Sequence, residues 1–260
     1  MSFEENMANF SKKLFICFSA KDRYNIVQPI VYHLKNYGIN IWYDRYEMVM
    51  GDDRFIKNLE EGAGKCKYAL IVLSSNTIES VCATEEIKIL ESRYYKKEVV
   101  IFPVLYELMP CNIPPKFDWI RNMIFKEVNR TTGTLEICNH IACKITQDML
   151  CSCTYRTIRE MINANLPLPK SVNSLLEKYT QIDSANLNSR IALLYATYTI
   201  IKLDHLTADS LCEVPTKAFE RLFNETLLNL TVDYREIWVL ENSLCILIDH
   251  YVTSCIESKI

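Results

Sequence analysis

The stretch LIVLSSNTIESVCATEE, residues 70–86, decides the fold class of this chain. It opens with an apolar run typical of a buried strand, passes through a polar turn at 74–76, and enters a helix that carries Cys82 and Glu85. Open α/β sheets build ligand crevices in this way, beyond the carboxyl ends of their strands. A carboxylate at such a mouth is costly unless it is solvated, paired or used in function.

Apolar runs alternate with helical patterns over residues 13–150. This alternation predicts right-handed crossovers and a parallel sheet covered on both faces, in which the central strands are continuous apolar runs. We therefore expect an α/β, flavodoxin-like domain with about five strands. The expected strands are 14–18, 39–43, 68–73, 99–105 and, as a short last strand, 123–125; the expected helices are 26–37, 55–61, one through Ala83, Ile87, Leu90 and Tyr94, and 134–150.

After residue 150 strand patterns disappear and helical patterns remain. Ile191, Leu194, Tyr198 and Ile201 form one apolar stripe, which is typical of a helix that buries one face. The sequence therefore predicts a polar tail at 1–12, the α/β domain at 13–150 and an all-α C-terminal domain or extension at 151–260. The expected C-terminal helices are 155–164, 171–179, 188–203, 216–230 and 234–252.

Composition limits the possible partners and location. The net charge is −3, so a nucleic-acid or acidic-membrane partner has no electrostatic support. No apolar run reaches the ~18 residues that cross a bilayer, and the polar N-terminus MSFEENMANF does not resemble a signal peptide. With 11 cysteines, an odd number, we expect reduced thiols in a cytoplasmic protein.

A cluster of cysteines and one histidine over residues 138–153 suggests a metal site. Its spacing is not that of a zinc ribbon or zinc finger, because Cys138 and Cys143 are five residues apart on an expected helix. We therefore expect no metal.

Three segments, the last of them within 70–86, have a characteristic order and spacing. They are FICFSAKD at 15–22, IWYD at 41–44 with Gly51-Asp52 after it, and SVCATE at 80–85. Together they resemble the Toll/interleukin-1 receptor (TIR) domain of the bacterial kind. The boxes of that family usually read F-I-S-Y-S-S-K-D, then W-Y-D with L-x-x-G-D, then S-x-W-C-x-x-E. Val81 stands where the family usually has Trp.

The resemblance implies that the chain cleaves NAD+ at the nicotinamide–ribose bond, with NAD+ as substrate and no cofactor beyond it. The products would be ADP-ribose or a cyclised isomer, and Glu85 matches the catalytic glutamate of the family. Nicotinamide departs neutral from a cationic pyridinium, so the ribose gains positive charge that a nearby carboxylate stabilises. In bacteria such proteins often serve anti-phage defence, as in the signal-producing component of Thoeris-like systems.

Strand ends at one edge of the sheet supply the expected substrate-binding residues. In the family, this edge of the sheet contacts the nicotinamide and its ribose. Each residue is also compatible with a plain role in the core, in a helix cap or in a turn. Cys82 is expected to line the pocket rather than act as a nucleophile, because no histidine lies near it in the sequence. Lys21 is a candidate phosphate ligand, and Glu86 is interpreted as a surface residue or a supporting partner. The expected substrate-binding residues are Phe18, Ser19, Tyr43, Asp44, Ser74, Ser75 and Cys82.

A non-enzymatic TIR adaptor, or a virulence protein that mimics host TIR domains, is the alternative function. It would act through the loop at 45–53, the assembly loop of the family, and Val81 in place of Trp favours it. Under either reading we expect self-association through the TIR domain, with the C-terminal helices as a second candidate surface. A phage-derived trigger is a further expected partner.

Overall fold

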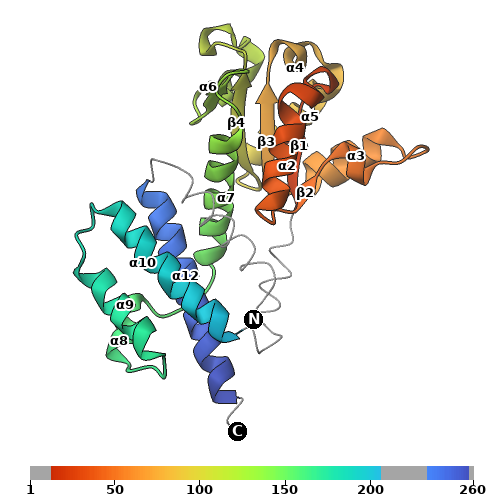
Figure 1. Cartoon of the computed structure of the whole chain (residues 1–260). Coiled ribbons are helices and arrows are strands. Elements are labelled where there is room, and N and C mark those ends of the chain that lie inside the picture. The colour runs from red at the N-terminus through yellow and green to blue at the C-terminus, as the bar shows by residue number, and fades with distance from the viewer. Residues whose placement is uncertain (1–12, 206–232, 258–260) are drawn as a thin grey trace. The chain divides into compact units, whose positions relative to one another are not determined.

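The computed structural model describes residues 13–205 and 233–257 (Figure 1). The chain divides into two compact units, residues 1–141 and 142–260, and helix α7 (Leu135–Leu150) runs across the division. The predicted domain boundary at residue 150 stays a prediction. Among the described residues, no helix combines the length and the apolar character needed to span a bilayer.

The first unit contains a five-stranded sheet in which every pair is parallel and the order is β2-β1-β3-β4-β5. This confirms the predicted flavodoxin-like α/β class. The strand order reverses at β1, which lies between β2 and β3, and open sheets bind ligands at such a switch point. The strands are β1 (Leu14–Cys17), β2 (Ile41–Trp42), β3 (Tyr68–Leu73), β4 (Val100–Tyr106) and β5 (Lys126–Val128).

The predicted last strand at 123–125 is wrong. The structure places β5 at Lys126–Val128, paired with β4 on one side only, and leaves Ile124 exposed in the turn before it. An edge strand need not be apolar on both faces, so its sequence does not show the continuous run that marks the central strands.

Alternate residues of β1 and β3 serve opposite faces of the sheet. Phe15, Ala69 and Ile71 belong to one buried cluster, in which they pack with the apolar stripe of helix α5 (Val81–Tyr95). On the other face lies helix α2 (Gln28–Asn36), and the thiol of Cys138 in α7 donates to the carbonyl oxygen of Ile30 at 3.8 Å. The remaining helical segments of this unit are η1 (Ala20–Asp22), η2 (Arg23–Val27), α3 (Asp44–Glu47), η3 (Phe55–Ala63), α4 (Ser75–Glu79), η4 (Pro110–Asn112), η5 (Pro115–Phe117) and α6 (Asp118–Arg121).

Segment η3 is a π-helix that packs unusually close to the sheet. The sequence predicts a helix at 55–61 that ends near Gly62 and Gly64, and the structure has η3 end at Ala63, with Gly64 as its C-cap. A Cβ atom at position 62 would lie 2.7 Å from Cε2 of Phe15 and 3.3 Å from the Trp42 ring. Glycine is therefore needed for η3 to approach β1 and β2 this closely.

Replacing Gly62 by alanine should destabilise the first unit. The added methyl group must displace the buried Phe15 ring, and overpacking of this kind costs about 1–3 kcal/mol. Urea unfolding of the full chain measures this as a lower midpoint for the loss of α/β structure. Glu60→Ala, at an exposed position of the same segment, is the control and should unfold like the wild type. Equal midpoints for Gly62→Ala and the wild type would contradict the argument.

The second unit is helical in its described part, as predicted. Its helices are α8 (Ile158–Asn163), α9 (Lys170–Gln181), α10 (Leu187–His205) and α12 (Tyr234–Glu257). One polar network joins three of them: Arg190 Nη2 contacts Tyr179 Oη at 2.6 Å and Glu241 Oε2 at 2.9 Å, and Tyr179 Oη donates to the same carboxylate oxygen. The predicted helix at 216–230 lies outside the described residues.

Candidate functional site

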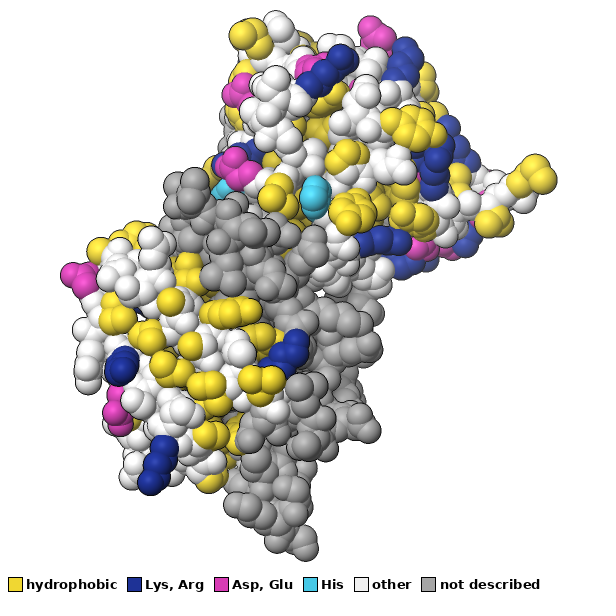
Figure 2. Space-filling model, in the orientation of Figure 1, with side chains coloured by type: hydrophobic (Ala, Val, Ile, Leu, Met, Phe, Trp, Pro, Cys, Tyr) yellow, Lys and Arg dark blue, Asp and Glu magenta, His cyan; other side chains and the backbone are white. Residues whose placement is uncertain are grey.

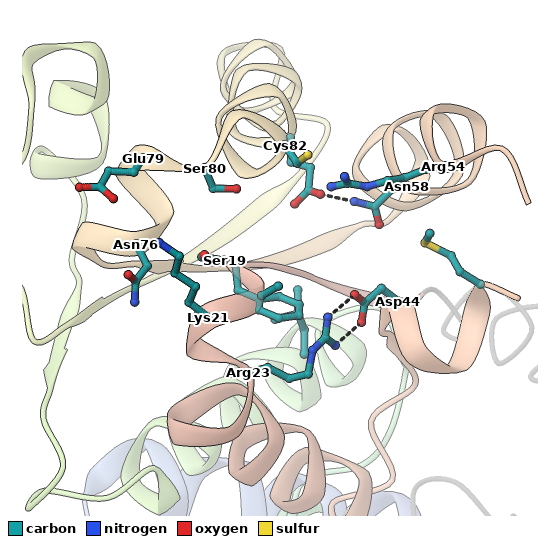
Figure 3. A pocket seen from close by; sticks show the side chains of 15 residues that line it. Ser19, Lys21, Arg23, Asp44, Arg54, Asn58, Asn76, Glu79, Ser80 and Cys82 are labelled. Carbon is teal, nitrogen blue, oxygen red and sulfur yellow. Dashed lines mark hydrogen bonds and ion pairs between the residues drawn. The ribbon is translucent and has the colours of Figure 1, made fainter. Parts of the chain in front are cut away.

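A cavity of about 450 Å³ opens where β1 and β2 end, within the first unit (Figure 3). This volume lies in the usual range of small-molecule sites. Ten of its fifteen lining residues are polar or charged, and they come from the loop after β1, the region of α3 and η3, and the segment from α4 into α5. The lining residues are Ile16, Phe18, Ser19, Ala20, Lys21, Arg23, Asp44, Met48, Arg54, Asn58, Asn76, Glu79, Ser80, Cys82 and Glu86.

Glu86 is the buried acid of this cavity. Helix α5 begins after Ser80, whose hydroxyl accepts a hydrogen bond from the Ala83 amide at 3.3 Å. From that start, Ala83, Glu86 and Leu90 fall on the buried face of the helix, and Glu86 is only 5% exposed. The interpretation of Glu86 as a surface residue is therefore wrong.

Glu85 lies on the exposed side of α5, outside the main cavity. It lines a smaller cavity of about 250 Å³, which shares Arg54, Asn58, Cys82 and Glu86 with the main one. The catalytic role assigned to Glu85 stays a prediction, but its neighbour is the carboxylate that faces the larger cavity.

The motif itself contains the signal that separates the two glutamates. In S-x-W-C-x-x-E the acid stands six residues after the serine, and counting from Ser80 reaches Glu86. Counting from Cys82 as the motif cysteine reaches Glu85 instead. With the count from Ser80, Cys82 occupies the tryptophan position, and it lines both cavities. Val81, by contrast, is 71% exposed.

The surroundings of Glu86 shift the pKa of its carboxyl group. Burial raises its pKa from 4.5 to about 8, while the Cys17 thiol, the charge of Arg54 and a hydrogen bond from Asn58 act in the opposite direction. Nδ2 of Asn58 donates to Oε1 of Glu86, as the dashed line from Asn58 in Figure 3 shows. A perturbed carboxylate in a cavity is a common mark of a functional site.

A second polar cluster explains where Tyr43 and Asp44 lie. Arg23 holds Asp44 with two bonds, at 2.6 and 2.7 Å, and donates to Tyr43 Oη at 3.0 Å. Its guanidinium lies 4.9 Å from the ring centre of Phe18 and 5.4 Å from that of Tyr43. Tyr43 is buried and does not line the cavity, so its predicted contact with substrate is not supported; Asp44 does line it, as half of an ion pair.

Ser74 and Ser75 also lie outside the cavity lining. The hydroxyl of Ser74 donates to buried Asp22 and accepts from the Thr77 amide at 3.0 Å, so it caps α4 and joins the ends of β1 and β3. Ser75 is exposed in the first turn of α4. The structure thus assigns Ser74 a structural role and corrects the interpretation of 74–76 as a simple turn.

Four of the predicted site residues are brought together at the cavity: Phe18, Ser19, Asp44 and Cys82. Lys21 reaches the same cavity near Asn76 and Ser19, as Figure 3 shows. Arg54 and Asn58 also line the cavity but are not among the residues expected from the sequence, and Glu86 was expected at the surface or as a supporting partner. No three metal-ligating side chains converge among the residues that the structure describes.

The loop after α3 projects from the first unit and carries apolar side chains at its tip (Figure 2). Met50 is fully exposed and Val49 is 73% exposed. The turn is held by Asp52, whose carboxylate accepts from the Val49 amide at 2.9 Å, and by Gly51 with φ +101°. This exposed apolar tip lies within the predicted assembly loop.

Comparison with known families assigns the first unit. A family model described as "TIR domain" matches residues 14–132. Residues 14–132 are a TIR domain. The match covers the sheet and every residue that lines the cavity.

Relatives of the TIR domain carry names of NAD+ enzymes. The chain is 29% identical over 97 residues to "NAD(+) hydrolase TcpA" of Theionarchaea archaeon (strain DG-70-1), a match of 37% of this chain and 29% of that one. It is 25% identical over 128 residues to "2' cyclic ADP-D-ribose synthase AbTIR" of Acinetobacter baumannii, covering 49% and 46% of the two chains. The matched region thus spans less than half the length of either relative.

The TIR domain of the Toll-related receptor TRR-2 from Hydra magnipapillata superposes with a TM-score of 0.41 at 17% identity, covering 53% of this chain and 98% of that one.

Proposed function

We propose that the TIR domain cleaves NAD+ at the nicotinamide–ribose bond and that Glu86 is the carboxylate that stabilises the reacting ribose. The observation that carries this proposal is a nearly buried acid, Glu86, on the wall of a ligand-sized cavity at the switch point of the sheet. The names of the relatives, NAD+ hydrolase and 2' cyclic ADP-D-ribose synthase, support the same reaction.

The chemistry needs a single ionised carboxylate. The nicotinamide of NAD+ leaves as a neutral base and requires no proton, so no second acid is needed for departure. Positive charge develops on the ribose as the bond breaks, and an anion within a partly dry cavity stabilises that charge more strongly than one in water. Glu86 fits this role, because it reaches the cavity from the buried face of α5.

The cations at the cavity suit the diphosphate of the same substrate. Arg23 is committed to Asp44 by a two-bond ion pair. Lys21 and Arg54 line the cavity on different segments, and Lys21 was already a candidate phosphate ligand from its sequence position. We assign these two side chains to the diphosphate.

Capture of the ribosyl cation decides the product. Attack by water gives ADP-ribose, whereas attack by an atom of the adenosine half gives a cyclic isomer. We propose a cyclic ADP-ribose product that acts as a signal in bacterial anti-phage defence, with activity raised by self-association through the loop at 45–53. The exposed Val49 and Met50 at the tip of that loop support the self-association.

The test uses the purified full chain with NAD+, with and without a crowding agent that promotes assembly. Chromatography follows nicotinamide release, and mass spectrometry identifies the ADP-ribosyl product. Turnover under either condition supports the proposal. No nicotinamide release in either condition, or in lysate from phage-infected cells, would favour the adaptor reading. If linear ADP-ribose were the sole product, the proposal of a cyclic product would be wrong.

A further inference from the structure

Glu86 is held from outside its own helix by Asn58. Asn58 lies in η3, is 7% exposed, and its amide nitrogen donates to Oε1 of the Glu86 carboxylate. Both side chains line the two adjoining cavities. The bond joins residues 28 positions apart, so it depends on how η3 packs against α5.

The packing of η3 leaves Asn58 little freedom. Gly62 lets the segment sit against the rings of Phe15 and Trp42, and Leu59 is buried beside Asn58. At the C-terminal end of the segment, Arg93 of α5 donates to the carbonyl oxygen of Ala63 at 2.6 Å. Two bonds, one from the middle of η3 and one at its C-terminal end, therefore fasten this segment to the helix that carries Glu86.

Glu86 meets titratable or charged groups from several elements. Cys17 of β1, Asp44 of α3 and Arg54, the residue before η3, all interact with its carboxylate. Cys82, on its own helix, lines the same cavity. The Cys17 thiol is also buried and lies close enough to interact with Glu86, but its Sγ donates to the carbonyl oxygen of Ala83 at 3.6 Å. Asn58 differs from all of these groups because its side chain does not titrate and its amide nitrogen donates directly to the carboxylate.

We propose that Asn58 is the positioning residue of the site: it fixes one oxygen of Glu86 toward η3 and favours the ionised form, so that the other oxygen faces the cavity. Asn58 acts through Glu86 and needs no contact with the substrate. The proposal deepens the function proposed above and rests on it for its effect on turnover. A buried amide that donates to a carboxylate stabilises the charged form of that carboxylate.

The first experiment measures ionisation without turnover. The carboxyl carbon of Glu86 is followed by ¹³C NMR in the full chain, with the Glu86→Gln variant to identify its signal. In Asn58→Ala the midpoint should move to higher pH by about one unit, a tenfold change in the ionisation constant. Asn58→Asp keeps the side-chain volume and adds a like charge, so its shift should be larger.

The second experiment measures nicotinamide release from pH 6 to pH 9. At pH 7 Asn58→Ala should lower kcat by roughly tenfold, with KM changed less than about threefold, because the ionised fraction of Glu86 falls. The loss should shrink as the pH rises, which a merely structural role would not produce. Glu60→Gln, an exposed position of the same segment, is the matched control and should keep the wild-type profile.

The outcomes separate this inference from the function itself. An unchanged Glu86 titration in both Asn58 variants overturns the positioning role, even where Glu86→Gln is inactive. A loss of activity that is equal at every pH overturns it as well. If the wild type cleaves no NAD+ while Asn58→Ala still shifts the titration, the proposed function fails and the control of Glu86 by Asn58 stands.

Discussion

Glu86→Gln should abolish nicotinamide release from NAD+, with a loss of at least about a hundredfold in kcat. Glutamine fills the same space and keeps a polar contact for Asn58, but it brings no negative charge to the ribose. Removal of one electrostatic stabiliser of a transition state commonly costs 10²–10³-fold in rate. Chromatographic assay of the full chain, under the conditions that promote assembly, measures the effect.

Glu85→Gln is the matched control, since it makes the same change one residue away on the exposed side of α5. It should retain activity within about threefold, because the Glu85 side chain is exposed and does not line the main cavity. The reverse result, an inactive Glu85 variant beside an active Glu86 variant, would restore Glu85 as the catalytic residue and remove Glu86 from that role.

Glu86→Gln should also stabilise the TIR domain at alkaline pH. Burial raises the pKa of Glu86 from 4.5 to about 8, so between these values the folded state holds a proton that the unfolded chain has lost. Stability contributed by this group is therefore present at low pH and decreases as the pH rises from about 4.5 to 8. The full separation corresponds to a decrease of about 5 kcal/mol.

Glutamine does not ionise, so the stability of the Glu86→Gln variant should not decrease over this pH range. Hydrogen exchange of the β3 amides reports unfolding of the TIR domain within the full chain. At pH 8 these amides should exchange more slowly in Glu86→Gln than in the wild type, by about 2–4 kcal/mol in opening free energy. At pH 5 the two proteins should agree within about 1 kcal/mol. Equal protection at pH 8 would show that Glu86 carries no ionisation penalty.

The sheet was predictable because its central strands are buried on both faces. β3 and β4 are continuous apolar runs, and the predicted bounds 68–73 and 99–105 differ from the structure by at most one residue. β5 escaped prediction because an edge strand with Lys126 and Glu127 does not show the apolar run that full burial requires. The nearby run at 123–125 is more hydrophobic but lies before the strand and does not pair with β4.

The location of the site was predictable from topology, since the ends of β1 and β2 meet at one edge of the sheet. The direction of individual side chains was not. Ser74 carries a hydroxyl typical of ligand sites, but it is used by Asp22 and α4. Asn58 gave no sequence signal, because its partner is 28 residues away. Glu86 did give a sequence signal, since it falls on the buried stripe of Ala83 and Leu90, where burial of a carboxylate costs free energy.

One wall of the cavity is already rigid before any molecule arrives. Buried Asp22 accepts hydrogen bonds from Ser74 and, at 2.6 Å, from Asn76, and these bonds join the segments that follow β1 and β3. Ordering side chains on association costs about 0.5–1.5 kcal/mol for each one immobilised. If the proposed dinucleotide binds here, Asn76 is already ordered by folding, so the loss of side-chain freedom on binding falls on Lys21 and on the opposite wall around Arg54.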